Sequence, residues 1–272
     1  MSGLTLTLRL LERLSQRIDM TPFTPHGLAG KSPNDIARLP LWLGNRQVDC
    51  GELFNISGSL EDEVIIQSDS DRLDRIGAGM TGGCVRVEGN AGAYLGCGMR
   101  NGTIEVSGNA GLAAGCAMSG GSLTIGGNAG DFLGGALTGD RQGMRGGRLT
   151  VKGNVGDRAG DLLRRGTILI GGDCGDYCAS RMIAGTLVVL GHTGIQTGHA
   201  MRRGTLIVTR HPKSMPATFN DNGNHQLSFL TLLTHHLGEH APFSALAERG
   251  NRVQRWVGDL SCDGKGEILL LE

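Results

Sequence analysis

The chain has 272 residues, of which 26 are basic and 26 are acidic, so its formal net charge is zero. That balance argues against a nucleic-acid partner, because nucleic-acid binders usually carry a basic surplus. Glycine contributes 47 residues without recurring at every third position, which excludes collagen, and an apolar content of 39% is enough for a core, which excludes general disorder.

The N-terminal segment, residues 1–47, is predicted to form a small cap. Residues 4–10 alternate between apolar and polar types, as a strand does, and Ser32 followed by Pro33 is typical of a helix start. The first residues lack the apolar core of a signal peptide, and no apolar run approaches the roughly 20 residues of a membrane span. Together with the odd number of 7 cysteines, this predicts a cytoplasmic protein with no membrane partner.

A 19-residue repeat organises residues 48–210. Its regular copies begin at Met80, and one copy carries an insertion at 137–143. Glycine holds the fourth position of each copy, aliphatic residues hold the sixth and eighth, and a Gly-Asn pair commonly follows at the tenth and eleventh. Residues 48–57 and 59–68 resemble degenerate copies, as terminal repeats often do.

The repeat predicts the fold. Aliphatic residues at alternate positions indicate a strand with one buried face, and the Gly-Asn pair that follows is typical of a tight turn. Nineteen residues leave no room for a long helix, and a single copy buries too few side chains to offset the entropy of ordering its backbone. We therefore expect an all-β protein, a right-handed parallel β-helix of about seven to nine coils in which equivalent residues stack about 4.8 Å apart.

The repeat ends near residue 210, and residues 211–272 are predicted to form a small α/β cap. Residues 227–237 and 242–249 indicate short helices, whereas 253–257 and 267–271 indicate strands around a glycine-rich turn. A cap of this kind would protect the open edge of the last coil.

Three strings imitate catalytic signatures. Gly77–Gly82 matches G-x-G-x-x-G, but no helix-length segment follows, so glycine here indicates turns and not a dinucleotide site. Gly30–Ser32 resembles the end of a phosphate-binding loop without the glycine that should begin it. His236–His240 fits H-x-x-E-H, yet its central glycine weakens the required helix, and we expect a polar helix end and no metal site.

Two cysteine pairs and a column of methionines have structural explanations. Cys97 and Cys116 occupy equivalent positions of adjacent copies and could form a disulfide, but two packed thiols are expected in a reducing compartment. Cys174 and Cys178 lack C-x-x-C spacing, so no metal is expected there. The methionines that begin most copies are expected to form stacked core or an interface ridge. They are Met80, Met99, Met118, Met144, Met182 and Met201.

Arginines at the second and third positions of the copies form the candidate site. Stacked about 5 Å apart, they would repel one another unless anions lay between them. A solvated face is the alternative to a surface that binds a partner's carboxylates or an anionic ligand, for which the arginine fork is suited. The candidate contact residues are Arg100, Arg145, Arg164, Arg165, Arg202 and Arg203.

An acidic column supports a rival hypothesis, that the chain is a β-helix enzyme. Asp131, Asp157 and Asp176 share the fourteenth position of their copies, and some parallel β-helices carry clustered carboxylates that cleave sugars. A free-standing binding module is a third possibility. We predict no catalytic residue and no metal ligand in this chain.

The repeated pattern resembles a known family. A G-x-x-M-x-x-G string followed by two alternating aliphatic residues and a further glycine recurs at Gly77–Gly89, Gly96–Gly108 and Gly115–Gly127. It is similar to the C subunit of formylmethanofuran dehydrogenase, more so to the C subunit of the formyltransferase/hydrolase complex of methylotrophic bacteria, and to the GXGXG β-helix of glutamate synthase. Residues 28–32, 41–45 and 256–259 extend the resemblance over nearly the whole chain.

The resemblance implies a non-catalytic subunit that holds catalytic partners. In the bacterial complex, formyl passes from formyl-tetrahydromethanopterin to methylofuran, and formyl-methylofuran is hydrolysed to formate. The implied partners are amidohydrolase-like, formyltransferase and molybdopterin-enzyme-like subunits. The implied coenzyme of the complex is methylofuran, whose glutamate tail would suit the arginines. An archaeal-type formylmethanofuran dehydrogenase is the alternative complex. A glutamate-synthase domain is disfavoured, because the synthase and amidotransferase regions are missing from this sequence.

Overall fold

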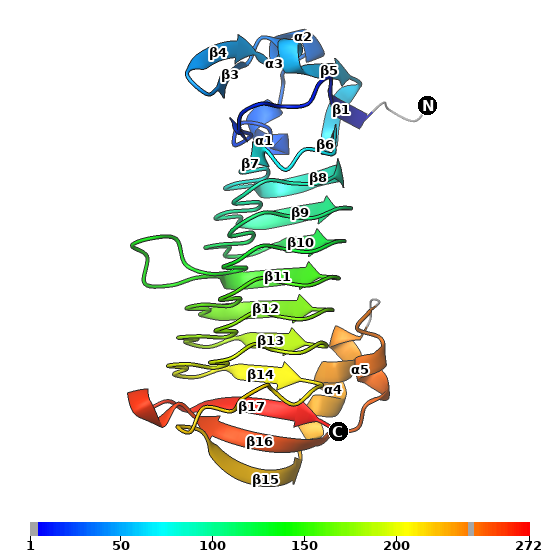
Figure 1. Cartoon of the computed structure of the whole chain (residues 1–272). Helices are drawn as coiled ribbons and strands as arrows, with labels where there is room; N and C mark the ends of the chain where they lie inside the picture. Colours follow the sequence, from blue (N-terminus) through cyan, green and yellow to red (C-terminus); the bar gives the residue numbers. More distant parts are fainter. Residues whose placement is uncertain (1–4, 239–241) are drawn as a thin grey trace.

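The computed structural model describes residues 5–238 and 242–272. The molecule is mostly β, and one 13-stranded sheet runs along a rod of stacked coils (Figure 1). Two small sheets pair β2 (Ile18–Asp19) with β7 (Leu73–Asp74) and β3 (Pro40–Leu43) with β4 (Arg46–Asp49). The strand order of the large sheet is β15 (Asn220–Gln226), β16 (Arg252–Gly258), β17 (Gly266–Leu271), β14 (Thr205–Val208), β13 (Thr186–Val189), β12 (Arg165–Ile170), β11 (Arg145–Val151), β10 (Ser122–Ile125), β9 (Asn101–Val106), β8 (Thr81–Gly89), β6 (Ser59–Ser68), β1 (Thr5–Leu10) and β5 (Phe54–Ser57).

Parallel pairing links the strands from β1 to β17 in one continuous series. Equivalent residues of adjacent copies lie opposite each other, as in the pairs Ile104 with Leu123 and Leu187 with Leu206, so the stacking of 19-residue copies is confirmed. The strands of this series are β1 (Thr5–Leu10), β6 (Ser59–Ser68), β8 (Thr81–Gly89), β9 (Asn101–Val106), β10 (Ser122–Ile125), β11 (Arg145–Val151), β12 (Arg165–Ile170), β13 (Thr186–Val189), β14 (Thr205–Val208) and β17 (Gly266–Leu271).

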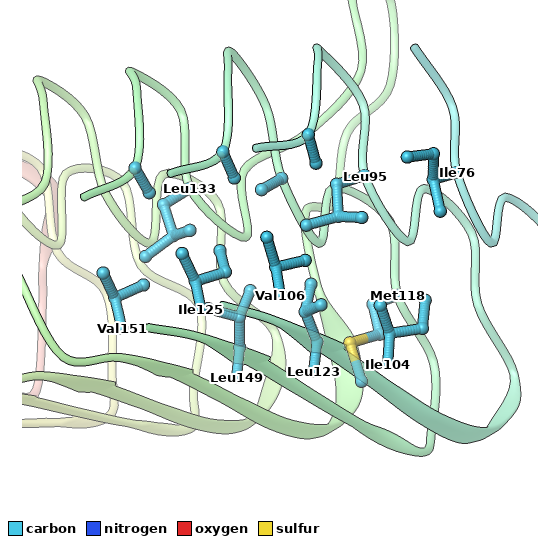
Figure 2. Packing of buried hydrophobic residues seen from close by; sticks show 14 of the residues in the cluster. Ile76, Leu95, Ile104, Val106, Met118, Leu123, Ile125, Leu133, Leu149 and Val151 are labelled. Atoms are coloured by element: carbon cyan, nitrogen blue, oxygen red, sulfur yellow. The ribbon is translucent and has the colours of Figure 1, made fainter. Parts of the chain in front are cut away.

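Columns of aliphatic side chains from opposite walls fill the interior of the rod. The sixth and eighth residues of every copy point inward, and Leu95 and Leu133 approach them from the opposite wall (Figure 2). The methionines at the start of the copies are 0–1% exposed, which confirms the stacked-core alternative for this column. Burying an aliphatic side chain of this size contributes about 1.5–3 kcal/mol, so each added coil extends the core that one copy cannot make alone.

The turns stack as regularly as the strands. The amide N–H of Asn109 donates to the side-chain oxygen of Asn90 at 2.8 Å, and Asn128 repeats the contact with Asn109 at 2.8 Å. A second line of single-residue parallel bridges runs from Ala91 through Ala110 and onward to Thr193. The side chains of the Gly-Asn turns therefore satisfy backbone donors of the next coil, which a turn at the protein surface would otherwise leave to water.

The N-terminal segment differs from the prediction in one respect. Helix α2 (Pro33–Ala37) starts as expected, with Ser32 and Asp35 forming a capping box. Residues 48–57, however, do not form a coil: β5 (Phe54–Ser57) runs antiparallel to β1, so that expectation was wrong. Strand β1 itself supplies the parallel neighbour of β6. The other elements are β2 (Ile18–Asp19), α1 (Pro25–Leu28), β3 (Pro40–Leu43), β4 (Arg46–Asp49), α3 (Cys50–Leu53) and β7 (Leu73–Asp74).

The C-terminal residues close the far end of the rod and cover part of its side. Strand β17 adds a parallel rung to β14, and β16 (Arg252–Gly258) and β15 (Asn220–Gln226) continue the sheet in antiparallel pairing. Helices α4 (Ser228–Leu237) and α5 (Ala245–Glu248) pack on outward apolar residues such as Leu169, Val188 and Ile207 (Figure 1). A short 3-10 helix, η1 (Leu260–Cys262), joins β16 to β17. The division into segments 1–47, 48–210 and 211–272 stays a prediction.

Candidate functional site

The predicted arginines lie exposed on the rod. Arg145 and Arg165 are direct partners in the β11–β12 ladder, and the backbone N–H groups of Arg164 and Arg202 donate to the preceding coil at 2.9 and 2.8 Å. Within the described ranges, none of the six has an acidic side chain within 4.0 Å. We call them the arginine edge: Arg100, Arg145, Arg164, Arg165, Arg202 and Arg203.

A hollow beside this edge brings Arg202 together with two arginines that the sequence did not indicate. Its volume is about 530 Å³. Arg141 comes from the 137–143 insertion, which extends away from the rod between β10 and β11 (Figure 1), and Arg181 ends the coil after β12. We call this the arginine hollow, lined by Asp140, Arg141, Leu162, Arg181, Ile183, Ala200, Arg202 and Cys262.

Arg181 is fixed in place by a buried carboxylate. Asp161 is 2% exposed, and its Oδ1 accepts a hydrogen bond from Nε of Arg181 at 2.9 Å while its Oδ2 accepts a second from the same guanidinium. The hydroxyl of Ser180 donates to Asp161 at 2.7 Å. The hydrogen bonds to Asp161 raise the pKa of Arg181, against the effect of burial. The guanidinium is held by a two-point contact yet remains half-exposed.

An aromatic groove of about 490 Å³ adjoins the arginine hollow, and the two share Asp140, Leu162 and Arg181. The guanidinium of Arg75 lies 5.2 Å from the ring centre of Tyr94, a cation–π distance. The insertion loop therefore overhangs two connected depressions, one lined by aromatic rings and one by arginines.

The acidic column has a structural role. The backbone N–H of Asp157 donates to the carboxylate of Asp131 at 2.8 Å, and Asp176 repeats the contact with Asp157 at 2.8 Å. Asp176 accepts in turn from the N–H of Ile195 at 2.9 Å. Each carboxylate thus binds the next coil, as the asparagines do on the neighbouring column, and this ladder explains the residues on which the enzyme hypothesis rested.

The other motif residues fall into turns and caps. Gly77 and Gly79 take positive φ angles in the turn before β8, and Ser32 caps α2. Nε2 of His236 lies 2.7 Å from a guanidinium nitrogen of Arg148, while Glu239 and His240 lie outside the described residues. Within the described part of the chain, no group of three His, Cys, Asp or Glu residues could hold a metal ion.

The seven cysteines are free, as expected. The thiols of Cys97 and Cys116 share a hydrogen bond, which lowers the pKa of Cys97 to about 7 and, with burial, raises that of Cys116. Cys174 is hydrogen-bonded to Cys178, and that bond together with burial raises the pKa of Cys174. Cys174 and Cys178 belong to the interior core of the rod, whereas Cys97 and Cys116 pack in a separate cluster with Tyr94, Phe132 and Leu137.

The stacked glycine turns define the class of protein. Residues 84–228 match the GXGXG motif family model, which is more than half of the chain, and the chain belongs to this family.

Its relatives are subunits of formyl-processing complexes. It is 42% identical over 89 residues to the C subunit of the formyltransferase/hydrolase complex of Methylorubrum extorquens, 33% of this chain and 34% of the relative. It is 35% identical over 84 residues to the C subunit of a molybdenum-containing formylmethanofuran dehydrogenase of Methanosarcina barkeri, 29% of this chain and 28% of that one. The aligned parts thus span about a third of these relatives or less.

A solved structure matches over nearly the full length. It is the crystal structure of the formyltransferase/hydrolase complex (FhcABCD) of M. extorquens with methylofuran, in which one chain is 42% identical with a TM-score of 0.91. The match covers 97% of this chain and 98% of that one. Among the described helices, none is long and apolar enough to cross a membrane.

Proposed function

We propose that this chain is the non-catalytic structural subunit of a one-carbon complex that transfers formyl from formyl-tetrahydromethanopterin to methylofuran and hydrolyses formyl-methylofuran to formate. The observation that carries the proposal is the match to one chain of the M. extorquens complex over 97% of this chain. The ladder role of Asp131, Asp157 and Asp176 supports a structural interpretation of the acidic column.

The scaffold in this proposal is a right-handed parallel β-helix. Parallel strands that follow one another in the same sheet are joined by right-handed connections in about 98% of cases. The pairing from β8 to β14 consists only of such consecutive parallel strands. The free thiols favour a reducing cytoplasm as its location.

The partners in this proposal are amidohydrolase-like, formyltransferase and molybdopterin-enzyme-like subunits, and the arginine edge is where an acidic partner surface docks. Arginines stacked at about 5 Å repel one another, and a partner's carboxylates would relieve that repulsion through paired N–H···O contacts. Methylofuran belongs to the complex as its coenzyme in this proposal, and its glutamate tail is the second anion that the edge could contact.

The test is co-purification from cells that carry a tagged chain. The tagged wild-type chain should elute with partner subunits. The pair Arg164→Glu with Arg202→Glu should lose them, because it places acid against acid. The matched control, Arg13→Glu with Arg38→Glu, makes the same charge change at exposed residues of the N-terminal segment and should leave assembly intact. Unchanged assembly and methylofuran retention in the first pair would remove the edge from the proposal.

Two other functions would give different results. A formylmethanofuran dehydrogenase, favoured by the similarity to the M. barkeri subunit, would co-purify with molybdenum or tungsten and iron–sulfur clusters. An independent β-helix enzyme would turn over a formyl amide or a polysaccharide with the isolated chain alone, and that result would refute the structural role.

A further inference from the structure

We propose that the arginine hollow is a binding site for an organic carboxylate with a short aliphatic body. The inference goes beyond the structural role proposed above and does not depend on it, although Arg202 belongs to both the edge and the hollow. The guanidinium groups of Arg141, Arg181 and Arg202 line the hollow together with the carboxylate of Asp140, and Arg181 is paired with the buried Asp161. Among the described residues, only Arg181 of these three has a carboxylate within 4.0 Å, so the guanidinium groups of Arg141 and Arg202 form no ion pair there.

The guanidinium of Arg181 already has a fixed orientation in the ligand-free chain. Its Nε–H and one terminal N–H are occupied by Asp161, which fixes the plane of the guanidinium. A guanidinium has five N–H donors, so three remain for other acceptors, and half of the side chain is exposed. Because the contact with the buried Asp161 already sets the orientation of Arg181, binding a carboxylate costs little additional side-chain entropy.

The apolar part of the lining selects an organic acid over an inorganic anion. Leu162, Ile183 and Ala200 line the same hollow as the arginines. The hollow measures about 530 Å³, far more than one carboxylate fills and within the range of small-molecule sites. A ligand with a carboxylate next to a chain of several methylene groups would satisfy the arginines and cover the apolar side chains at once.

The probe is glutarate, titrated into the isolated full-length chain by calorimetry, with sulfate as the inorganic comparison. We expect saturable glutarate binding and at least fivefold weaker sulfate binding. Arg202→Gln should weaken glutarate at least fivefold. Arg181→Lys keeps the charge beside Asp161 but loses the fork, and it should weaken glutarate by a similar factor. Arg38→Gln, at an exposed arginine outside both the hollow and the arginine edge, is the matched control and should bind as the wild type does.

Three results would overturn the site: no glutarate binding by a folded wild-type chain, equal affinity for sulfate, or equal weakening by Arg38→Gln and Arg202→Gln. Repeating the titration on the complex separates the two sources of the carboxylate. Glutarate binding that persists in the complex supports a free acid as ligand, whereas binding that disappears on assembly supports a partner's acidic side chain. Failure of the complex to form would refute the proposed structural role while leaving the titration of the isolated chain valid.

Discussion

Replacing Gly121 with alanine tests whether the coils are stacked as tightly as the structure shows. Gly121 holds the fourth position of its copy with φ +81°, and an added Cβ would lie 2.7 Å from the carbonyl oxygen of Gly102 in the preceding coil and 2.6 Å from Cε of Met99. The methionine tip can move, but the carbonyl belongs to the ladder. A positive φ costs alanine about 1–2 kcal/mol, and overpacking adds about 1–3 kcal/mol. Before any effect on the unfolded chain, these two costs sum to a loss of about 2–5 kcal/mol in the free energy of unfolding.

Gly98→Ala is the matched control, because it changes the same residue type in the same fold. Gly98 has φ +65°, and a Cβ there would meet nothing within 4 Å. Ala117 and Ala200 occupy the same last position of their own coils at φ 54°, so alanine already fits that place. In both variants alanine also stiffens the unfolded chain, which offsets about 0.4–1 kcal/mol of the loss. The expected net loss is therefore about 0–1.6 kcal/mol for Gly98→Ala and about 1–4.6 kcal/mol for Gly121→Ala.

Urea unfolding followed by circular dichroism measures both variants. The shared backbone contributions cancel in their difference, so that difference isolates the clash with the preceding coil, about 1–3 kcal/mol. Equal losses in the two variants would refute the reasoning, because they would mean that the neighbouring coil does not approach Gly121 closely.

Three further predictions concern the core, the C-terminal turn and the thiols. Leu149→Ala, at a fully buried position, should cost about 2–5 kcal/mol in urea unfolding, whereas Thr150→Ala on the outer face should cost under about 1 kcal/mol. Burial opposes ionisation of Asp259, but hydrogen bonds outweigh it and hold its pKa below the ordinary 3.8. The stability lost in Asp259→Asn should therefore be full at pH 7 and shrink below about pH 3.8 in pH-dependent unfolding. Alkylation of Cys97, followed by peptide mass spectrometry, should show a midpoint near pH 7, and Cys116→Ala should raise that midpoint; an unmoved midpoint would contradict the thiol–thiol hydrogen bond.

The regular coils could be predicted from sequence because each one faces a copy of itself. A position that must be glycine, aliphatic or methionine in one coil must be so in the next, and the period of 19 residues repeats the requirement along the chain. Gly121 and Met99 illustrate it: the methionine tip of one coil lies where the glycine of the next leaves room.

The ends of the rod could not be predicted in the same way. Residues 48–57 carry a glycine, a leucine and an asparagine at spacings that imitate a coil, yet β5 pairs antiparallel with β1. The true rungs at the two ends are β1 and β17, which reach the stack from distant parts of the chain. Strand β1 alternates and β17 ends in an apolar run, but neither carries the repeat, because a terminal rung has a matching neighbour on one side only.

The arginine hollow was missed for a related reason. Arg181 stands where adjacent coils have alanine or leucine, and Arg141 lies in the insertion, so neither belongs to a column of arginines. The signal that could have found them is a position at which one copy of the repeat has a different residue type from the equivalent positions of the other copies. Asp161 occupies the column that holds Cys97, Cys116, Ser180 and His199 in other copies, and a buried carboxylate requires a partner, which the structure supplies in Arg181.

Side chains that build the rod can be told from those available to a ligand or partner by whether the neighbouring coil uses their hydrogen bonds. The carboxylates of Asp131 and Asp157 bind backbone N–H groups of the next coil, so the fold itself accounts for them. The arginine edge has no such use within the described coils, and in the arginine hollow the only guanidinium with one is that of Arg181, which pairs with Asp161. Arg145 faces Arg165 across a ladder, an arrangement that opposes folding by like-charge repulsion and gains nothing from the stack. We therefore expect this scaffold to bind ligands or partners through arginines that the coils do not use, beside the insertion at residues 137–143.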